Sequence, residues 1–255
     1  MYHNIFDSHA HYDDEQFELD RNELLVSFKE KGISGVVCCG VDVKTSEFAV
    51  EFSHKFDFVY SAVGFHPLEN DAYTDEALER IKELAKDEKC VAIGEIGLDY
   101  HYEKESRDNQ LTLLEKQIQI ANELDLPIIF HDRESHEDTL NILKKYKPKG
   151  VLHCFSGSVE MAKEIIKLGM YIGLGGAVTF KNAVKPCEVA KFVPGDRLLI
   201  ETDAPYMTPV PFRGKRCDSL YIPYTAEKIA ELRGVTAQEI LDLTDKNARE
   251  LFNIK

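Results

Sequence analysis

Short apolar segments recur along the chain at intervals of a few tens of residues. They are near-continuous runs of Val, Ile, Leu, Phe and Cys rather than alternations of apolar and polar residues. Such runs are typical of parallel strands that are covered on both faces. Eight runs predict strands: residues 4–6, 35–39, 58–63, 90–93, 127–130, 150–152, 170–174 and 198–200.

The segments between these runs carry helical signals. Across residues 107–124, apolar side chains recur three and four positions apart, which is the spacing of one helix face. Thr236 and Glu239 form a capping-box pattern ahead of an apolar run. Gly32 and Gly169 follow helical segments and suit the left-handed conformation that ends a helix.

Strands that alternate with helices predict a parallel α/β fold. An open, doubly wound sheet is the alternative, but no GxGxxG pattern follows an early strand. No linker or repeat divides the chain, and single barrels commonly have about 250 residues. We therefore expect one domain over residues 1–255, a (β/α)8 TIM barrel with an eight-stranded parallel sheet and outer helices.

Metal-binding and acidic residue types follow most of the apolar runs. Because a barrel brings the C-terminal ends of all its strands to one rim, these residues should share a pocket. The spacing of two in His9-Ala10-His11 directs both imidazoles the same way on a strand. The residues at the predicted strand ends are His9, His11, His66, Glu95, His131, His153 and Asp203.

The number of these residues indicates how many ions they hold. Four histidines with Glu95 and Asp203 exceed the needs of one tetrahedral ion that keeps an open position. Two divalent cations that share a carboxylate would use all six ligands. Mixed imidazole and carboxylate ligation suits Zn²⁺ or Mn²⁺, with Mg²⁺ as a further choice, and the sequence leaves the identity open.

The net charge of −14 limits the partners. A protein that coats long nucleic acid by releasing counterions should be basic, so this class is excluded. A phosphate-bearing substrate must be attracted locally, by metals and a few arginines. Nothing in the sequence calls for an obligate protein partner.

The six cysteines show no CxxC spacing, and several lie in apolar runs. They predict reduced, mostly buried thiols and a cytoplasmic protein. The first residues lack the order of a signal peptide, and no apolar run approaches the roughly 20 residues of a membrane span.

Seven motifs, in order along the whole chain, resemble the TatD family of metal-dependent deoxyribonucleases, which belongs to the amidohydrolase superfamily. They are His9-Ala10-His11, Gly64-Phe65-His66-Pro67, Gly94-Glu95-Ile96-Gly97-Leu98-Asp99-Tyr100, His131-Asp132-Arg133, His153-Cys154-Phe155-Ser156-Gly157, Glu201-Thr202-Asp203-Ala204-Pro205-Tyr206 and the stretch from Pro209 to Arg216. The resemblance implies a TIM barrel with one metal on His9, His11, Glu95 and Asp203. It implies a second metal on Glu95, His131 and His153.

The resemblance also implies a reaction, hydrolysis of DNA phosphodiesters by a water that two metals activate. We expect the substrate to be DNA or another phosphodiester, attacked from an end or as a single strand. Asp203 is the candidate general base, and His66 either contacts substrate or supports the site. Glu201 and Asp7 are each expected either to hold a ligating imidazole by its second nitrogen or to be a paired charge inside the barrel. The residues expected to bind phosphate are Arg133, Arg213, Lys215 and Arg216.

Two rival functions fit the same residues. An ester or amide hydrolase, such as an aminoacyl-ester deacylase, could use the same ligands, but a neutral substrate would not need the basic loop. A metal-binding scaffold without turnover is the other rival, and it would not need all six ligands.

Overall fold

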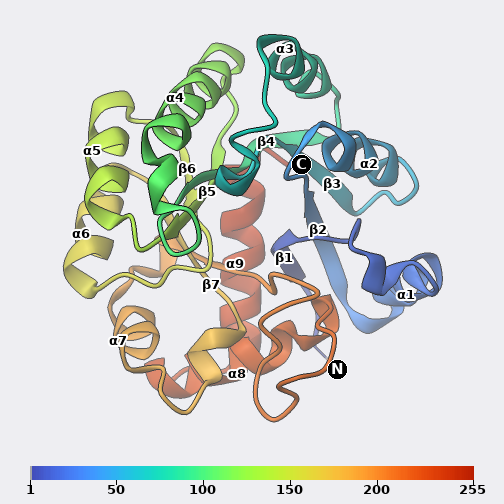
Figure 1. Cartoon of the computed structure of the whole chain (residues 1–255). Helices are drawn as coiled ribbons and strands as arrows, with labels where there is room; N and C mark the ends of the chain where they lie inside the picture. The colour runs from blue at the N-terminus through green and yellow to red at the C-terminus, as the bar shows by residue number, and fades with distance from the viewer. Residues whose placement is uncertain (1) are drawn as a thin grey trace.

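Eight parallel strands form one sheet in which each strand pairs with the next one along the chain. The computed structural model describes residues 2–255. The strands are β1 Ile5–Ala10, β2 Ile33–Cys39, β3 Val59–Val63, β4 Cys90–Asp99, β5 Ile128–Arg133, β6 Gly150–Leu152, β7 Tyr171–Leu174 and β8 Leu198–Ile200. The helices surround these strands (Figure 1).

The sheet closes where the segment after β8 meets β1. Ala10 and Ala204 form a parallel bridge, and the N–H of His11 donates to the carbonyl of Ala204 at 2.7 Å. The N–H of Asp203 donates to the carbonyl of His9 at 3.0 Å. These bonds join the two edge strands at their C-terminal ends, and the predicted (β/α)8 barrel is confirmed.

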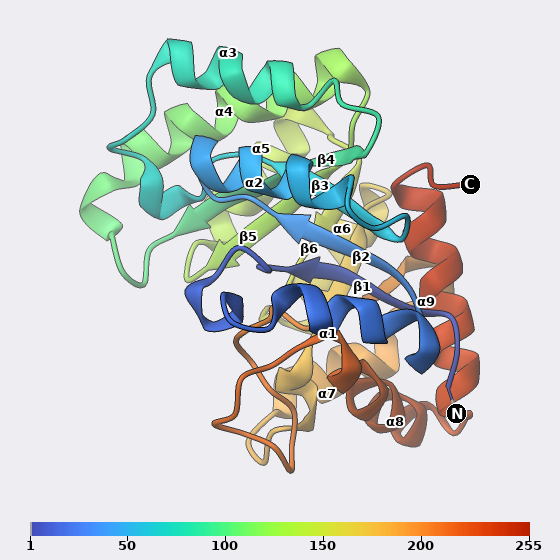
Figure 2. The same ribbon diagram turned by 90° about the vertical axis from the view of Figure 1, so that its right-hand side faces the viewer.

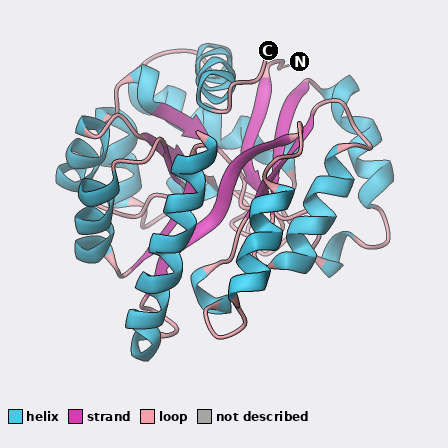
Figure 3. Ribbon diagram, turned by 90° about the horizontal axis from the view of Figure 1, so that it is seen from above, coloured by secondary structure: helices cyan, strands magenta, loops and turns pink. Residues whose placement is uncertain are grey.

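A helix follows each strand, so that α1 to α8 cover the outside of the barrel (Figures 1 and 3). The ninth, α9, lies across the end of the barrel opposite to the strand C-termini, near both chain termini (Figure 2). The helices are α1 Arg21–Phe28, α2 Val43–Ser53, α3 Asp75–Leu84, α4 Arg107–Leu124, α5 His136–Tyr146, α6 Val159–Lys167, α7 Val184–Phe192, α8 Ile222–Arg233 and α9 Ala237–Leu251.

The apolar residues form two cores, one on each face of the sheet. The larger core lies between the strands and the outer helices. The smaller one fills the inside of the barrel, where Phe6 and Val37 pack with Ala248 and Phe252 at the end of α9. Burial on both faces explains why the strand sequences are near-continuous apolar runs. It leaves the opposite mouth of the barrel for polar side chains.

Several local predictions are confirmed. The pattern over 107–124 is the helix α4 Arg107–Leu124, and Thr236 and Glu239 form the expected capping box. Gly32 and Gly169 have φ of 88° and 84°, in the left-handed region that glycine favours. Within residues 2–255, no helix is long and apolar enough to cross a bilayer.

The predicted C-terminal ends of three strands are wrong. β1, β4 and β5 continue past their apolar runs to Ala10, Asp99 and Arg133. The backbone carries the pairing there, with Gly97 opposite His131 and Asp99 opposite Arg133. Polar side chains end the apolar pattern but not the hydrogen-bond ladder, because at the barrel mouth they face a hydrated pocket. His9, Glu95 and His131 therefore lie on strands rather than on loops.

Candidate metal centre

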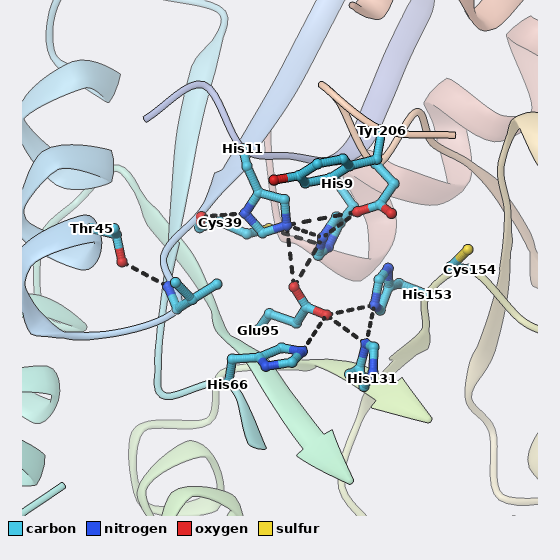
Figure 4. A network of polar contacts seen from close by, with 12 residues as sticks. His9, His11, Cys39, Thr45, His66, Glu95, His131, His153, Cys154 and Tyr206 are labelled. Atoms are coloured by element: carbon cyan, nitrogen blue, oxygen red, sulfur yellow. Dashed lines mark hydrogen bonds and ion pairs between the residues drawn. The ribbon is translucent and has the colours of Figure 1, made fainter. Parts of the chain in front are cut away.

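Glu95 of β4 lies at the centre of the histidines, and its two carboxylate oxygens face different pairs (Figure 4). Oε2 lies 3.3 Å from Nε2 of His9 and 3.2 Å from Nε2 of His11. Oε1 lies 2.8 Å from both Nδ1 of His131 and Nε2 of His153. Burial acts to raise the pKa of the Glu95 carboxyl, but the imidazoles of His153 and His9 hold it well below its usual range. The carboxylate is thus an ionised group between two sets of nitrogen donors.

The imidazoles of His9 and His11 point into the same cluster, as their spacing of two predicted. The two Nε2 atoms lie 3.0 Å apart, and Nδ1 of His11 lies 3.1 Å from the carbonyl oxygen of Cys39. Since a carbonyl only accepts, Nδ1 of His11 carries the hydrogen and Nε2 presents its lone pair to the cluster. Nδ1 of His9 faces the Cys39 thiol at 3.4 Å.

Asp203 completes this side of the cluster. Its Oδ1 lies 3.6 Å from Nε2 of His9 and 3.7 Å from Nε2 of His11. The residue has φ of 62°, a left-handed conformation that Asp tolerates better than most residues. Burial raises the pKa of the Asp203 carboxyl, as is useful in a proton acceptor.

On the other side, carboxylates lie behind the two histidines. Nε2 of His131 contacts Oδ2 of Asp99 at 3.2 Å, which leaves Nδ1 to face Glu95. Nδ1 of His153 lies 3.7 Å from Oε1 of Glu201, beyond hydrogen-bond range, and Glu201 also accepts the N–H of Cys154. Burial raises the pKa of Glu201 to about 8. Asp99 was given no role from the sequence, although it lies inside the Gly94–Tyr100 motif.

Asp7 does not hold an imidazole, so the first of its two expected roles is wrong, and its carboxylate accepts hydrogen bonds from backbone N–H groups and hydroxyls instead. Its Oδ1 accepts the backbone N–H groups of Thr202 at 3.0 Å and His9 at 3.3 Å. Its Oδ2 accepts the hydroxyls of Thr202 at 2.6 Å and Ser219 at 2.7 Å. Asp7 therefore joins the backbone of β1 to that of the segment after β8 and does not contact a ring. Burial raises its pKa to about 6.

The donor spacings fit divalent cations. Two ligands at about 2.0–2.1 Å from one tetrahedral ion lie roughly 3.3 Å apart. The spacings of 3.0 Å within the His9–His11 pair and 3.3 Å within the His131–His153 pair are of this size. Three donor sets have all their ligand atoms within 4.8 Å of one another: His9, Glu95 and His153; His9, His11 and Asp203; and His66, Glu95 and His131.

His66 differs from the other histidines in its hydrogen bonding. It precedes a short 3-10 helix, and its Nδ1 accepts the N–H of Leu68 at 3.2 Å. Nε2, which lies 3.6 Å from Oε1 of Glu95, must then carry the hydrogen in the neutral ring. His66 therefore presents a donor to the pocket rather than a lone pair.

Two buried glutamines of α4 support the rim, and sequence reasoning missed them. Gln117 accepts the N–H of Phe65 at 2.7 Å and donates to its carbonyl at 3.0 Å, next to His66. Gln110 makes the same pair of bonds to the backbone of Asp99, at 2.8 and 2.9 Å. Buried polar residues seven apart on an otherwise apolar helix face were the available signal.

A cavity of about 760 Å³ opens over the cluster. Asp13, Asp14, Glu69 and Asp132 line it, and Arg133 is the only lysine or arginine among its lining residues within 2–255. Arg133 thus lies where a substrate phosphate can reach it. The acidic residues repel a polyanion at the mouth of the cavity.

Arg213, Lys215 and Arg216 are not among the residues that line this cavity. Arg216 forms two hydrogen bonds to the carboxylate of Asp20, at 2.6 and 2.7 Å. The guanidinium of Arg213 lies over Phe180, 3.9 Å from the ring centroid, and Lys215 is exposed. The structure brings Arg133 alone of the four predicted phosphate-binding residues to the metal cluster.

A parallel barrel with histidine and carboxylate ligands around its C-terminal rim is the architecture of metal-dependent hydrolases. The family model for TatD related DNase matches residues 6–253, and the chain belongs to this family. It is 47% identical to the "Uncharacterized metal-dependent hydrolase YabD" of Bacillus subtilis, over 98% of this chain and 99% of the relative. It is 33% identical to the "3'-5' ssDNA/RNA exonuclease TatD" of Salmonella typhimurium, over 98% and 99%.

The solved structure of YJJV, a TatD homologue from Escherichia coli, superimposes on the barrel with a TM-score of 0.93 at 30% identity and 100% coverage of both chains. These comparisons agree with the seven motifs that suggested the family. The protein is a metal-dependent hydrolase of the TatD family.

Proposed function

We propose that the protein hydrolyses phosphodiester bonds of DNA with two divalent cations that share Glu95. The observation that carries this proposal is the placement of the two Glu95 oxygens against two separate histidine pairs. His9, His11 and Asp203 would hold one cation with Glu95. His131 and His153 would hold the other.

When bound, such a pair of cations supplies the positive charge that lowers the pKa of water and polarises a phosphoryl oxygen. The chain's own groups do the rest. Asp203, buried and with a raised pKa, takes the proton of the attacking water. His66 donates a hydrogen bond from Nε2 to the negative charge that develops on the phosphate. Arg133 contacts a phosphate at the cavity mouth.

The size of the cavity favours a chain end over a duplex. A volume of about 760 Å³ lies in the range of roughly 300–1,000 Å³ that is usual for small-ligand sites. A few nucleotides of a single strand fill such a space. The similarity to the 3'-5' ssDNA/RNA exonuclease TatD of Salmonella typhimurium supports the same substrate class. Arg213, Lys215 and Arg216 would contact phosphates further along the strand.

The acidic mouth supports a second candidate. Besides Glu95 and Asp203, four carboxylates line the cavity with one arginine among the described residues, and this lining suits a substrate with little negative charge. A carboxylic ester or an amide could be attacked by the same water, with Asp203 and His66 in the same roles.

One assay separates the two candidates. The protein is stripped of metal, reloaded with Zn²⁺, Mn²⁺ or Mg²⁺, and given a single-stranded oligonucleotide, an aminoacyl ester and an amide. We expect the oligonucleotide to be cleaved with the highest kcat/KM. Hydrolysis of the ester or amide without cleavage of the oligonucleotide would reject the nuclease and favour the second candidate.

A further inference from the structure

Tyr102 projects from the β4–α4 loop at the mouth of the cavity. Its side chain is 62% exposed, yet it is one of the cavity-lining residues. As a lining residue of the cavity that opens over the cluster, the ring is within reach of a ligand bound there.

The backbone of Tyr102 is tied to the metal centre. Oδ1 of Asp99 accepts the N–H of His101 at 2.9 Å and the N–H of Tyr102 at 3.1 Å. The other oxygen of Asp99 contacts Nε2 of His131 at 3.2 Å. One carboxylate therefore contacts both the imidazole of His131 and the backbone of the loop that carries the exposed ring.

Arg133 and His101 are neighbours of the Tyr102 ring. The guanidinium carbon of Arg133 lies 4.7 Å from the centroid of Tyr102, over one face. The ring of His101 meets Tyr102 edge to face, with centroids 4.7 Å apart and an angle of 80°, and its Nδ1 is held by Glu134 at 2.7 Å. The exposed part of the ring can stack on a planar group, while the charge of Arg133 can meet a phosphate.

We propose that Tyr102 and Arg133 form a nucleotide subsite, in which the base of the nucleotide next to the scissile bond stacks on Tyr102 and its phosphate contacts Arg133. The subsite rests on the proposed nuclease function. Stacking on an aromatic ring tolerates every base, because each base has a π-face. The subsite thus binds a strand end without sequence preference and excludes a paired end, whose base is already stacked and hydrogen-bonded.

Tyr206, labelled in Figure 4, is the other exposed tyrosine among the described lining residues of the cavity. The residue is 52% exposed. Its hydroxyl donates to Oδ2 of Asp14 at 2.8 Å, and Asp13 lies in the same wall of the cavity. A nucleotide that stacked there would place its phosphate beside carboxylates. Charge complementarity therefore favours Tyr102.

The test compares single-stranded oligonucleotides that carry either a normal base or an abasic residue at the terminal position, with both ends examined. Tyr102→Leu removes the ring, and Tyr102→Phe keeps it without the hydroxyl. Tyr224→Leu is a matched control, because Tyr224 packs against Phe212 outside the cavity-lining residues and is 37% exposed. The readouts are kcat/KM and, for metal-free protein, the quenching of a terminal 2-aminopurine, which reports stacking without turnover.

For the wild type, Tyr102→Phe and Tyr224→Leu, we expect the abasic end to lower kcat/KM roughly 5- to 150-fold, the range that corresponds to base–aromatic stacking. Tyr102→Leu should lose this discrimination and the 2-aminopurine quenching. Discrimination that survives in Tyr102→Leu and disappears in Tyr206→Leu would place the base on Tyr206 and overturn the proposal. If the wild type cleaves normal and abasic oligonucleotides equally well, the subsite alone is overturned. If it cleaves no oligonucleotide, the nuclease function is overturned and the subsite with it.

Discussion

The backbone N–H of Leu68 donates a hydrogen bond to Nδ1 of His66 at 3.2 Å. This bond fixes the tautomer of the ring, so that the hydrogen lies on Nε2 and points into the pocket. His66 lies close enough to Glu95 to be counted with the ligands, but its lone pair is used by the backbone. In this tautomer His66 presents an N–H to the cavity, whereas His11 presents the lone pair of its Nε2 to the cluster.

Two substitutions of His66 separate the role of Nδ1, which accepts the N–H of Leu68, from the role of Nε2, which donates into the pocket. Asparagine places a polar atom near the position of Nδ1, and glutamine places one near Nε2. We expect His66→Asn to keep the cap of the 3-10 helix but to lower kcat by about 10²-fold, as the loss of one donor to a developing charge does. His66→Gln should lose less. The bound metal, measured by elemental analysis, should be unchanged in both variants, and a loss of metal in either would make His66 a ligand.

The shared Glu95 predicts a metal content of about two divalent ions per chain at saturation. His131→Ala should lower the content toward one, because it removes a nitrogen on the Oε1 side and leaves the His9–His11 pair intact. Elemental analysis after gel filtration measures both values. At most one ion in the saturated wild type would disprove the two-metal assignment.

Asp203→Asn keeps the volume of the side chain and removes its charge and its basic oxygen. We expect kcat to fall by about 10²-fold or more, which is typical of the loss of a general base. The far-UV circular dichroism spectrum should not change, since the backbone bond from Asp203 to His9 remains possible. Near-normal turnover would remove Asp203 from the mechanism.

Arg133 and the loop residues Lys215 and Arg216 should each contribute to the binding of an oligonucleotide. Arg133→Ala should raise KM and reduce the slope of log affinity against log salt by about 0.7, the value for one phosphate contact on a single strand. The double variant Lys215→Ala/Arg216→Ala should also raise KM and flatten this slope, with kcat changed less. Unchanged KM and slope in the double variant would remove the loop from substrate binding.

Asp20→Ala is the control for Arg216, because it frees the guanidinium without deleting it. If Arg216 binds phosphate, this variant should keep or improve KM. If Arg216 is only a structural ion pair, Asp20→Ala and Arg216→Ala should lower the melting temperature alike and leave KM unchanged.

The cysteines predict slow thiol chemistry. Burial raises the pKa of Cys38 and Cys90 to about 12, so the reactive thiolate is scarce at pH 8. We expect these two thiols to resist iodoacetamide in the native protein and to react once it is unfolded. Mass spectrometry of the labelled peptides measures this, and rapid native labelling at either residue would contradict the packing.

Much of the fold could be predicted from the sequence, because its signals are local. The run at 150–152 is β6, the pattern over 107–124 is α4, and the capping box at Thr236 starts α9. The candidate ligands could be predicted too, since a parallel barrel brings every strand end to one rim. The wrong strand ends at 93 and 130 have the same cause. The apolar run in the sequence ends where polar residues begin, but the backbone pairing of the strands continues beyond that point.

Only the tertiary structure decided which partner each polar side chain contacts. Asp99 contacts His131 across 32 positions, and Asp7 reaches Ser219 across 212, so no local pattern could pair them. Both Asp7 and Glu201 fit the sequence-based role of an imidazole partner, yet only Glu201 lies beside a ring. The direction in which each carboxylate points depends on the rotamer that its packed neighbours allow, and those neighbours come from distant strands that meet only when the barrel closes.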